Sequence, residues 1–256
     1  MLGIINETEM TQFRFCLNYL RIILEAPEVT ADVMDIALVD AKSAEAICGH
    51  HEYPFPSWKR AADLVIASIA LLFLLPLMLF VAILIALDGG EVIFGHTRVG
   101  TGGRLFRVLK FRTMCPCADQ KLAAYLERNE AARHEWQLTH KLRNDPRVTW
   151  VGSFLRKSSI DELPQLLNVL RGEMSIVGPR PIIQSEVVKY GRYIRHYKQC
   201  RPGITGLWQV SGRNDVTYRR RVAFDTIYSR HVGDLRFELA VVLRTIPAVL
   251  RSKGSY

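Results

Sequence analysis

A run of residues without a charged side chain constrains this sequence more than any other feature. It comprises the twenty-four residues from Leu64 to Leu87, and only Ser68 and Pro76 interrupt its apolar character. As one helix it would measure roughly 36 Å at about 1.5 Å per residue, enough to cross a hydrocarbon core of about 30 Å. The run therefore belongs in a lipid bilayer, and a single spanning anchor is the simplest interpretation.

A second interpretation is a helix that enters the bilayer, bends and returns to the same side. Pro76 lies near the centre, where a missing backbone donor bends a helix and leaves two halves too short to cross alone. Basic residues flank the run on both sides: Lys59 and Arg60 before it, and Arg98, Arg104, Arg107 and Lys110 after it. The positive-inside tendency then favours the cytosol at both ends. The residues alone leave the two topologies about equally open.

Charge is distributed unevenly along the chain. The formal net charge is +9, but residues 1–58 contain nine acids and three bases, and residues 59–256 contain sixteen acids and thirty-one bases. A basic surface attracts phosphorylated molecules, anionic lipid head groups or nucleic acid. The bases gather around the apolar run and the sequence carries no DNA- or RNA-reading motif, so we expect no nucleic-acid partner.

The cysteines indicate a reducing compartment. There are five of them, an odd and scattered set that argues against a disulfide framework. One residue separates Cys115 from Cys117, whereas zinc and redox motifs place two or more residues between their thiols. The segment Met1–Thr11 contains Glu7 and Glu9 and no basic residue, so it does not resemble a secretory signal. We expect a chain exposed to the cytosol.

The pattern beyond the apolar run predicts an α+β fold that is mostly helical. Short strands are expected over Val92–Phe94 and Phe106–Phe111, with a glycine-rich turn between them. Helices are expected over residues 119–143, 160–170, 183–197 and 235–250. We divide the chain into an acidic N-terminal extension (1–57), a membrane-embedded segment (58–90) and a cytosolic domain of helices and a few short strands (91–256).

Two adjacent acids, Asp161 and Glu162, lie in the part of the sequence that is richest in candidate functional residues. Helix capping alone would account for them, because Ser159 and Glu162 match an S-x-x-E capping box and acids in a first turn complement the helix dipole. Pro164 weakens that account, since it would fall beyond the first turn, where its missing N–H breaks a needed hydrogen bond. A helix that begins near Asp161 is therefore favoured.

Several cations could act with these acids on a diphosphate. They are Arg156, Arg180 in a loop between two prolines, and the pair Lys110 and Arg112. Arginine offers bidentate contacts to phosphate, and a rigid loop reduces the entropy lost in aiming them. We expect a carboxylate among cations to stay ionised, which suits a nucleophile or a metal ligand. Phosphoryl transfer requires this combination of groups.

Eight short motifs then follow one another in a familiar order. They are Lys59-Arg60 with Asp63, Gly89-Gly90 with Val92-Ile93-Phe94, Arg98-Val99-Gly100, Lys110-Phe111-Arg112-Thr113-Met114, Asp145-Pro146-Arg147, Asp161-Glu162-Leu163-Pro164-Gln165, Gly178-Pro179-Arg180-Pro181, and Arg201-Pro202-Gly203-Ile204-Thr205-Gly206. Through them, the chain from Lys59 to Ile246 resembles the bacterial sugar transferase family, the monotopic polyprenyl-phosphate phosphoglycosyl transferases. The resemblance is closest to the small members, which include galactose- and glucose-phosphate transferases of exopolysaccharide synthesis.

The resemblance implies transfer of a hexose 1-phosphate, galactose or glucose, from a UDP-sugar to undecaprenyl phosphate. Asp161 would be the nucleophile that displaces UMP, and Glu162 would share with it the catalytic role and the binding of Mg²⁺. The phosphates of the two substrates would contact four cations: Lys110, Arg112, Arg156 and Arg180.

The resemblance also implies a re-entrant helix bent at Pro76, with the catalytic domain on the cytosolic face of the bacterial inner membrane. A homodimer is among the assemblies we consider. Two departures from the family pattern stand out: Leu75 precedes Pro76 where many relatives have serine, and Ser229-Arg230 replaces the usual Trp-Ser pair after Tyr228.

Two other function classes stay open at this point. A membrane-anchored basic module could bind anionic lipids without catalysis and would not need Asp161 or Glu162. A membrane phosphohydrolase could use Asp161 with water as the acceptor. The sequence does not identify the residue that would distinguish glucose from galactose.

Overall fold

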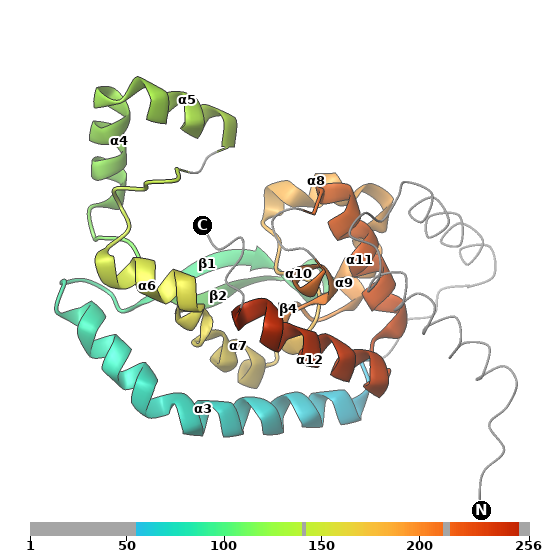
Figure 1. Ribbon diagram of the computed structural model, residues 1–256. Coiled ribbons are helices and arrows are strands. Elements are labelled where there is room, and N and C mark those ends of the chain that lie inside the picture. The colour runs from blue at the N-terminus through green and yellow to red at the C-terminus, as the bar shows by residue number, and fades with distance from the viewer. Residues whose placement is uncertain (1–54, 140–141, 212–215, 251–256) are drawn as a thin grey trace, which may run out of the picture. The chain divides into compact units, whose positions relative to one another are not determined.

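The computed structural model describes residues 55–139, 142–211 and 216–250. The chain divides into two units between Glu52 and Tyr53, and every described residue belongs to the second unit. Most of the predicted acidic extension therefore lies outside the described residues. Within the second unit, one long helix runs along one side of a set of shorter helices and two small sheets (Figure 1).

The apolar run forms one long helix, α3 (Ser57–Ala86), of 30 residues with Pro76 inside it. The helix continues through the proline, and its ribbon bends along its length (Figure 1). The expected interruption is therefore a bend, because proline removes one hydrogen bond and distorts the helix without ending it. Among the described residues, α3 is the one helix that is long and apolar enough to cross a membrane.

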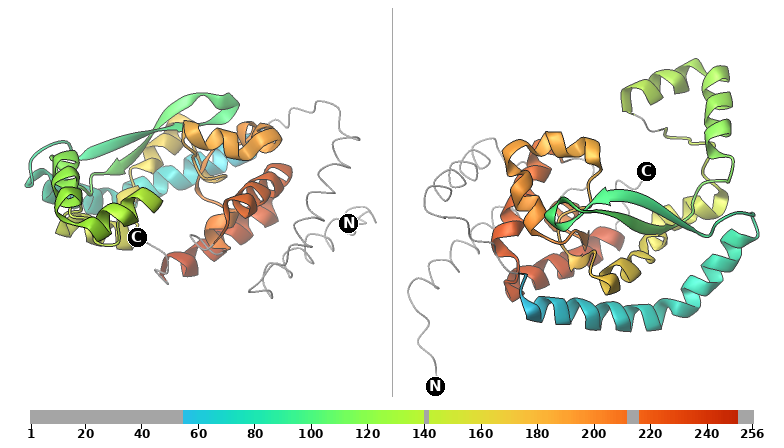
Figure 2. Two further views of the ribbon diagram at one scale, coloured as in Figure 1. Left: turned by 90° about the horizontal axis from the view of Figure 1, so that it is seen from above. Right: turned by 180° about the vertical axis from the view of Figure 1, so that it is seen from behind.

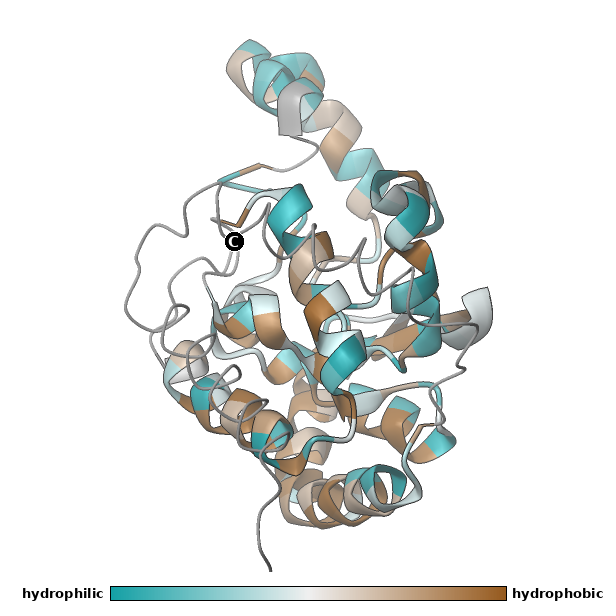
Figure 3. Ribbon diagram, turned by 90° about the vertical axis from the view of Figure 1, so that its right-hand side faces the viewer, coloured by the Kyte–Doolittle hydropathy of each residue, from teal (hydrophilic) through white to brown (hydrophobic). Residues whose placement is uncertain are grey.

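The two faces of α3 have different environments. Ala67, Val81 and Ile85 are buried against the rest of the domain, whereas Leu72 and Phe73 are 76% and 82% exposed. Figure 3 shows this helix as a mainly hydrophobic ribbon at the lower edge of the view. An apolar face of this length is unfavourable in water, so α3 associates with a membrane.

The expected pair of strands is a hairpin of β1 (Ile93–Val99) and β2 (Leu105–Phe111). The strands are antiparallel, with Ile93 opposite Phe111 and Val99 opposite Leu105. The short 3-10 helix η1 (Thr101–Gly103) joins them, and Gly102 and Gly103 take positive φ values in the turn. β1 is thus longer than predicted.

A short helix, α7 (Gln165–Arg171), lies between α3 and the hairpin (Figures 1 and 2). Ala67 of α3, Val108 of β2 and Val169 of α7 share one buried hydrophobic cluster. The predicted helix over residues 160–170 is divided into the 3-10 turn η2 (Ile160–Glu162) and α7. Pro164 separates the two, because it has no N–H to donate to a continuous helix.

A second sheet pairs β3 (Ser175–Val177) in parallel with β4 (Gly203–Thr205), which the sequence did not predict. The backbones approach so closely that a Cβ on Gly178 would collide with the carbonyl oxygen of Arg201. Glycine is therefore required here for steric reasons. This pairing brings together two loops that are distant in the sequence, one after β3 and one after β4.

The region after β2 contains three helices: α4 (Ala118–Arg128), α5 (Glu130–Thr139) and α6 (Trp150–Ser158). The single helix expected over residues 119–143 is broken at Asn129, whose side chain caps the second helix by accepting from Ala132 N at 3.0 Å. Thr149 caps α6 by accepting from Gly152 N at 2.9 Å. The helix α6 was not predicted.

The C-terminal part is a set of helices around three buried tyrosines. The predicted helix over residues 183–197 is four short pieces: η3 (Gln184–Glu186), α8 (Val187–Tyr190), η4 (Gly191–Tyr193) and α9 (Ile194–Gln199). Gly191, which has a positive φ, ends α8. Three more helices follow: α10 (Leu207–Val210), α11 (Tyr218–His231) and α12 (Leu235–Leu250). The bounds of α12 match the prediction, whereas α10 and α11 were not predicted.

Candidate active site

The backbone at Ser159 directs the two acids into the domain. Ser159 ends α6 with a left-handed conformation, φ 58°, the one positive φ of a non-glycine residue in the described ranges. A serine in this region is strained by about 1 kcal/mol or more. The reversal turns the chain from α6 into η2, where Asp161 is buried and Glu162 is partly exposed. Strained backbone of this kind gathers at functional sites.

Lys110 of β2 contacts both acids. Its Nζ lies 2.7 Å from Glu162 Oε1 and 3.6 Å from Asp161 Oδ2. Burial raises the pKa of Asp161 above its ordinary value, and the charges of Lys110 and Arg156 only partly counter this effect. Removing the carboxylate from water therefore has a larger influence on its pKa than the surrounding cations, and the expectation that Asp161 stays ionised remains a prediction.

Arg156 projects from α6 toward the extension of β2. Its Nε donates to Thr113 Oγ1 at 2.9 Å, which fixes the direction of the guanidinium. The approach is close because α6 has glycine at position 152, where a Cβ would collide with the carbonyl oxygen of Thr113. Burial lowers the pKa of Arg156, and the nearby Asp145 and Asp161 raise it in part.

Arg112 lies at the C-terminal end of α3. Its Nη2 donates to the carbonyl oxygen of Ile85 at 3.0 Å and is 3.8 Å from Asp88 Oδ2. The other two nitrogen atoms, Nε and Nη1, are buried without a hydrogen-bond partner in the described chain. Arg112 thus holds the helix end with one nitrogen and leaves two donors for a ligand.

Arg180 is exposed, and its guanidinium lies over the ring of Trp208 at 5.5 Å from the centroid. A second guanidinium, that of Arg221, lies 4.5 Å from the same centroid. Trp208 itself is buried. The tryptophan therefore supports Arg180 through a cation–π contact.

All six predicted site residues line one cavity of about 970 Å³: Lys110, Arg112, Arg156, Asp161, Glu162 and Arg180. The sequence separates them by up to 70 positions, and the fold brings them together. His96, Thr113 and Arg147 line the same cavity and were not assigned to the site from the sequence. Arg147 forms an ion pair with Asp145 at 2.6 Å, so that motif also belongs to the wall of the site.

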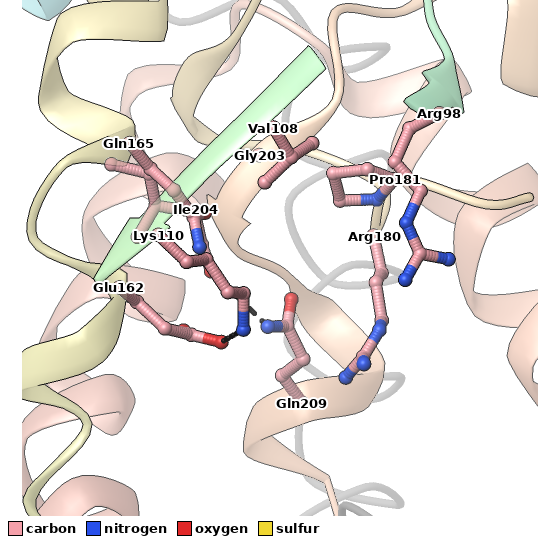
Figure 4. Close-up of a pocket in the computed structure, with 10 residues that line it drawn as sticks. All are labelled: Arg98, Val108, Lys110, Glu162, Gln165, Arg180, Pro181, Gly203, Ile204 and Gln209. Carbon is pink, nitrogen blue, oxygen red and sulfur yellow. Dashed lines mark hydrogen bonds and ion pairs between the residues drawn. The ribbon is translucent and has the colours of Figure 1, made fainter. Parts of the chain in front are cut away.

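A smaller pocket adjoins the large cavity and shares Lys110, Glu162 and Arg180 with it (Figure 4). Three polar side chains line only this smaller pocket: Arg98, Gln165 and Gln209. Arg98 and Gln165 lie in two of the quoted motifs and Gln209 lies three residues beyond the last one, but nothing in the sequence distinguished their polar atoms from ordinary structural ones. For Arg98 and Gln165, membership in a motif was the only available signal.

Asp161 and Glu162 could hold a cation such as Mg²⁺ only together with oxygen atoms of a bound substrate. The described residues contain no group of three or more histidine, cysteine, aspartate or glutamate side chains placed to hold a metal ion. Mg²⁺ commonly binds one or two carboxylates together with substrate phosphates. Asp161 and Glu162 provide that pair of carboxylates, so the residues fit an ion that is bound with a phosphorylated substrate.

Comparison with known proteins agrees with this chemistry. The profile of the family described as "Bacterial sugar transferase" matches residues 55–252. The "Exopolysaccharide production protein ExoY" of Sinorhizobium fredii is 53% identical over 199 residues, which cover 77% of this chain and 88% of that protein.

Two further relatives have names that state an activity. The "Undecaprenyl-phosphate galactose phosphotransferase" of Salmonella typhimurium is 46% identical over 77% of this chain and 41% of its own length. The "UDP-glucose:undecaprenyl-phosphate glucose-1-phosphate transferase" of Caulobacter vibrioides is 41% identical over 77% of this chain and 72% of its own length.

Proposed function

The chain belongs to the bacterial sugar transferase family, and from that premise we propose that it transfers a hexose 1-phosphate from a UDP-hexose to undecaprenyl phosphate. The product would serve exopolysaccharide synthesis, as the name of the ExoY relative suggests. The observation that carries the proposal is the meeting of two acids and four cations in one cavity. Galactose and glucose are the favoured hexoses, because relatives named for each are similar to this chain.

The proposed reaction has two displacements at one phosphorus atom. A carboxylate oxygen of Asp161 attacks the β-phosphorus of the UDP-hexose, and the bond to the bridging oxygen breaks to release UMP. A phosphate oxygen of the lipid then attacks the same phosphorus and displaces Asp161. Covalent catalysis of this kind divides one difficult transfer into two easier steps.

The environment of Asp161 favours its role as the nucleophile. Burial excludes water from the carboxylate and raises its pKa, so the ionised form is a stronger base than a solvated aspartate. Lys110 contacts both acids and is placed to stabilise charge that develops on the transferred phosphate. Arg112, whose Nε and Nη1 are buried and make no hydrogen bond within the described ranges, is a second such group.

Asp161 and Glu162 would hold Mg²⁺ together with the diphosphate. When bound, the ion would supply charge neutralisation at the phosphate oxygens. Chelation with EDTA should then abolish UMP release, and added Mg²⁺ should restore it.

We further propose that α3 is re-entrant, with both ends on the cytosolic face of the inner membrane. Polar contacts tie its N-terminal end to the domain: Lys59 pairs with Glu238 at 2.8 Å, and Asp63 Oδ1 accepts from Ile176 N at 3.0 Å. At the C-terminal end, Arg112 of the same domain donates to the carbonyl of Ile85. A helix that spanned the bilayer would have to separate these two ends, so the contacts favour a return to one side.

Cysteine labelling tests this topology. Ser57 and Cys117 are both exposed and lie on opposite sides of α3 in the sequence. Single-cysteine variants, Ser57→Cys in one and native Cys117 in the other, would be treated with an impermeant maleimide in intact spheroplasts and after lysis. Protection of both before lysis is expected, and labelling of one of them in intact spheroplasts would indicate a spanning helix.

The activity is tested with purified protein in detergent, undecaprenyl phosphate, Mg²⁺ and a panel of UDP-sugars. We expect UMP release with a hexose donor and a lipid-soluble sugar diphosphate as product, both lost in Asp161→Asn. Release of free sugar phosphate without the lipid would indicate a phosphohydrolase. Vesicle binding without UMP release from any donor would indicate the lipid-binding module. The homodimer stays a prediction, which mass photometry of the same sample would check.

A further inference from the structure

Gln209, on α10, presents a buried hydrogen-bond acceptor that has no partner in the described chain. Its Nε2 donates to the carbonyl oxygen of Ile204 at 3.1 Å, and its Oε1 is buried and unpartnered. The opposite orientation of the amide would place two oxygen atoms against each other, so the contact with Ile204 fixes the assignment. The free atom of Gln209 is therefore an acceptor.

Gln165, the first residue of α7, presents a second carboxamide to the same pocket. The residue is only 4% exposed, and its amide makes no hydrogen bond to the part of the chain that the structure describes. Figure 4 shows both glutamines lining the pocket beside Lys110. Two carboxamides from separate elements thus meet next to the reacting centre.

A third buried carboxamide shows how the chain satisfies such a group for structural purposes. Asn168 is fully buried, and its Nδ2 donates to the carbonyl of Arg107 at 2.8 Å and to Glu173 Oε2 at 2.6 Å. Its Oδ1 accepts from the backbone N–H of Leu109 at 3.0 Å. Buried polar groups are nearly always paired in this way, so the unpartnered Oε1 of Gln209 requires an explanation.

The chemistry of the free atoms indicates the ligand. A phosphate offers only acceptors at neutral pH, so it would repel Gln209 Oε1 and could use only donors. A sugar hydroxyl donates and accepts, which matches the two functions of a carboxamide. We propose that Gln165 and Gln209 bind hydroxyl groups of the transferred hexose and that this pocket determines which UDP-hexose reacts.

The position of the pocket agrees with this assignment. Lys110 and Glu162 lie on the boundary between the pocket and the large cavity, beside the proposed nucleophile. When the β-phosphorus is at Asp161, the hexose and the UMP leave it in different directions. The smaller pocket, about 40 Å³, has room for hydroxyl groups at one edge of the hexose, while the sugar ring and the nucleotide would lie in the adjoining large cavity. The inference rests on the proposed function, since it assigns a subsite for that donor.

The test replaces each glutamine by methionine, which keeps the length and removes the hydrogen bonds. We would measure the affinity for the preferred UDP-hexose and for UDP, which lacks the sugar, and the KM for undecaprenyl phosphate. The variants should bind UDP-hexose about tenfold or more weakly. Their affinity for UDP and their lipid KM should stay within about twofold of wild type. Gln184→Met is the matched control, because Gln184 is exposed and outside both pockets.

A second measurement begins with the wild-type protein alone, so its first step does not depend on the folding of any variant. UDP-hexose analogues that each lack one hydroxyl are compared as donors, and at least one should be used about tenfold less well. If Gln209 or Gln165 contacts the missing hydroxyl, the methionine variant of that glutamine should use this analogue almost as well as wild type does.

The outcomes separate this inference from the proposed function. If the wild type releases UMP from no UDP-hexose, the proposed function itself is wrong. If the wild type is active and both variants bind UDP-hexose with wild-type affinity, the pocket does not bind the hexose. Equal weakening for UDP and UDP-hexose, or a change confined to the lipid KM, would overturn the inference in favour of a structural or acceptor role.

Discussion

Buried polar groups at the N-terminal end of α3 and around Asp161 are alike in type but differ in their partners. At the helix end, Lys59 and Glu238 pair at 2.8 Å with side chains only 4% and 8% exposed, and Tyr228 Oη also donates to Glu238 at 3.0 Å. Around Asp161, Arg112 keeps two buried nitrogen atoms unpartnered among the described residues. The group of Lys59, Glu238 and Tyr228 uses its polar atoms to hold the fold, and Arg112 leaves two donor nitrogen atoms available for a ligand. The contrast concerns these groups, because Asp63 Oδ2 at the helix end is also buried without a partner among the described residues.

The comparison is tested most strongly at Asp161. Asp161→Asn removes the nucleophile and should lower UMP release by about 10³-fold or more. The melting temperature should stay equal or rise, because burial disfavours the carboxylate and an amide of the same shape avoids that penalty. Steady-state kinetics and thermal unfolding in detergent measure the two quantities. Glu127→Gln, at an exposed acid on α4, is the control; a large loss of stability in Asp161→Asn would contradict the distinction.

The opposite result is expected at the end of α3. Lys59→Met leaves Glu238 buried without its partner and should destabilise the domain by about 3–5 kcal/mol. The double variant Lys59→Met with Glu238→Leu should recover most of this loss, because no charge remains buried. Chemical unfolding of the purified proteins measures the difference. If Lys59→Met were as stable as wild type, the ion pair would contribute little to the free energy of unfolding.

The charge of Lys110 should appear in the pH dependence of the reaction. Asp161 must be ionised to attack, so kcat/KM falls as the pH drops through its pKa, which burial raises above that of free aspartate. Lys110 lowers this pKa, so Lys110→Met should raise it further and move the acid limb to higher pH. Lys157→Met, at an exposed neighbour, should leave the profile unchanged. An unshifted limb in Lys110→Met would mean that another group controls it.

The smallest effect is expected at a buried acid of the scaffold. Burial raises the pKa of Asp225 to about 7, although Tyr190 Oη donates to it at 2.7 Å. In the unfolded chain the pKa of this aspartate is about 3.9. Between that pH and about pH 7, Asp225 is protonated in the folded state and ionised in the unfolded state, so stability falls as the pH rises. Asp225→Asn should flatten this slope in melting temperatures between about pH 4 and pH 7. If the melting temperatures of wild type and Asp225→Asn changed equally with pH, Asp225 would not be the source of the pH dependence.

Local patterns in the sequence predicted several parts of the molecule. The uncharged run forms α3, alternating segments around a glycine turn form the β1–β2 hairpin, and the last predicted helix has the bounds of α12. These features depend on residues that are close in the chain, so periodicity and turn chemistry reveal them. The bounds of the short helices were harder to predict. A single residue such as Pro164 or Gly191 ends a helix where the composition of the following residues would still favour one.

The sequence predicted the charged residues of the candidate site but not its neutral polar residues. Every cation and acid assigned from the sequence lines the large cavity. Gln165 lies in a quoted motif and Gln209 lies just beyond another, and neither was given a role, since a glutamine in a sequence has the same appearance whether its amide is hydrogen-bonded or free. Asn168 illustrates the difference, because its partners come from β2 and from Glu173, two residues beyond the end of α7.

The sequence by itself determined that the chain carries a long uncharged helix, a basic domain and an acid pair with basic residues in neighbouring motifs, because composition and short motifs encode these properties locally. The tertiary structure alone decided which buried polar groups are paired, how the parallel β3–β4 contact joins two distant loops, and that both ends of α3 contact one domain. The physical reason is distance: a hydrogen bond or ion pair exists only between atoms that the fold brings within a few ångströms, and residues such as Lys59 and Glu238 are 179 positions apart in the chain.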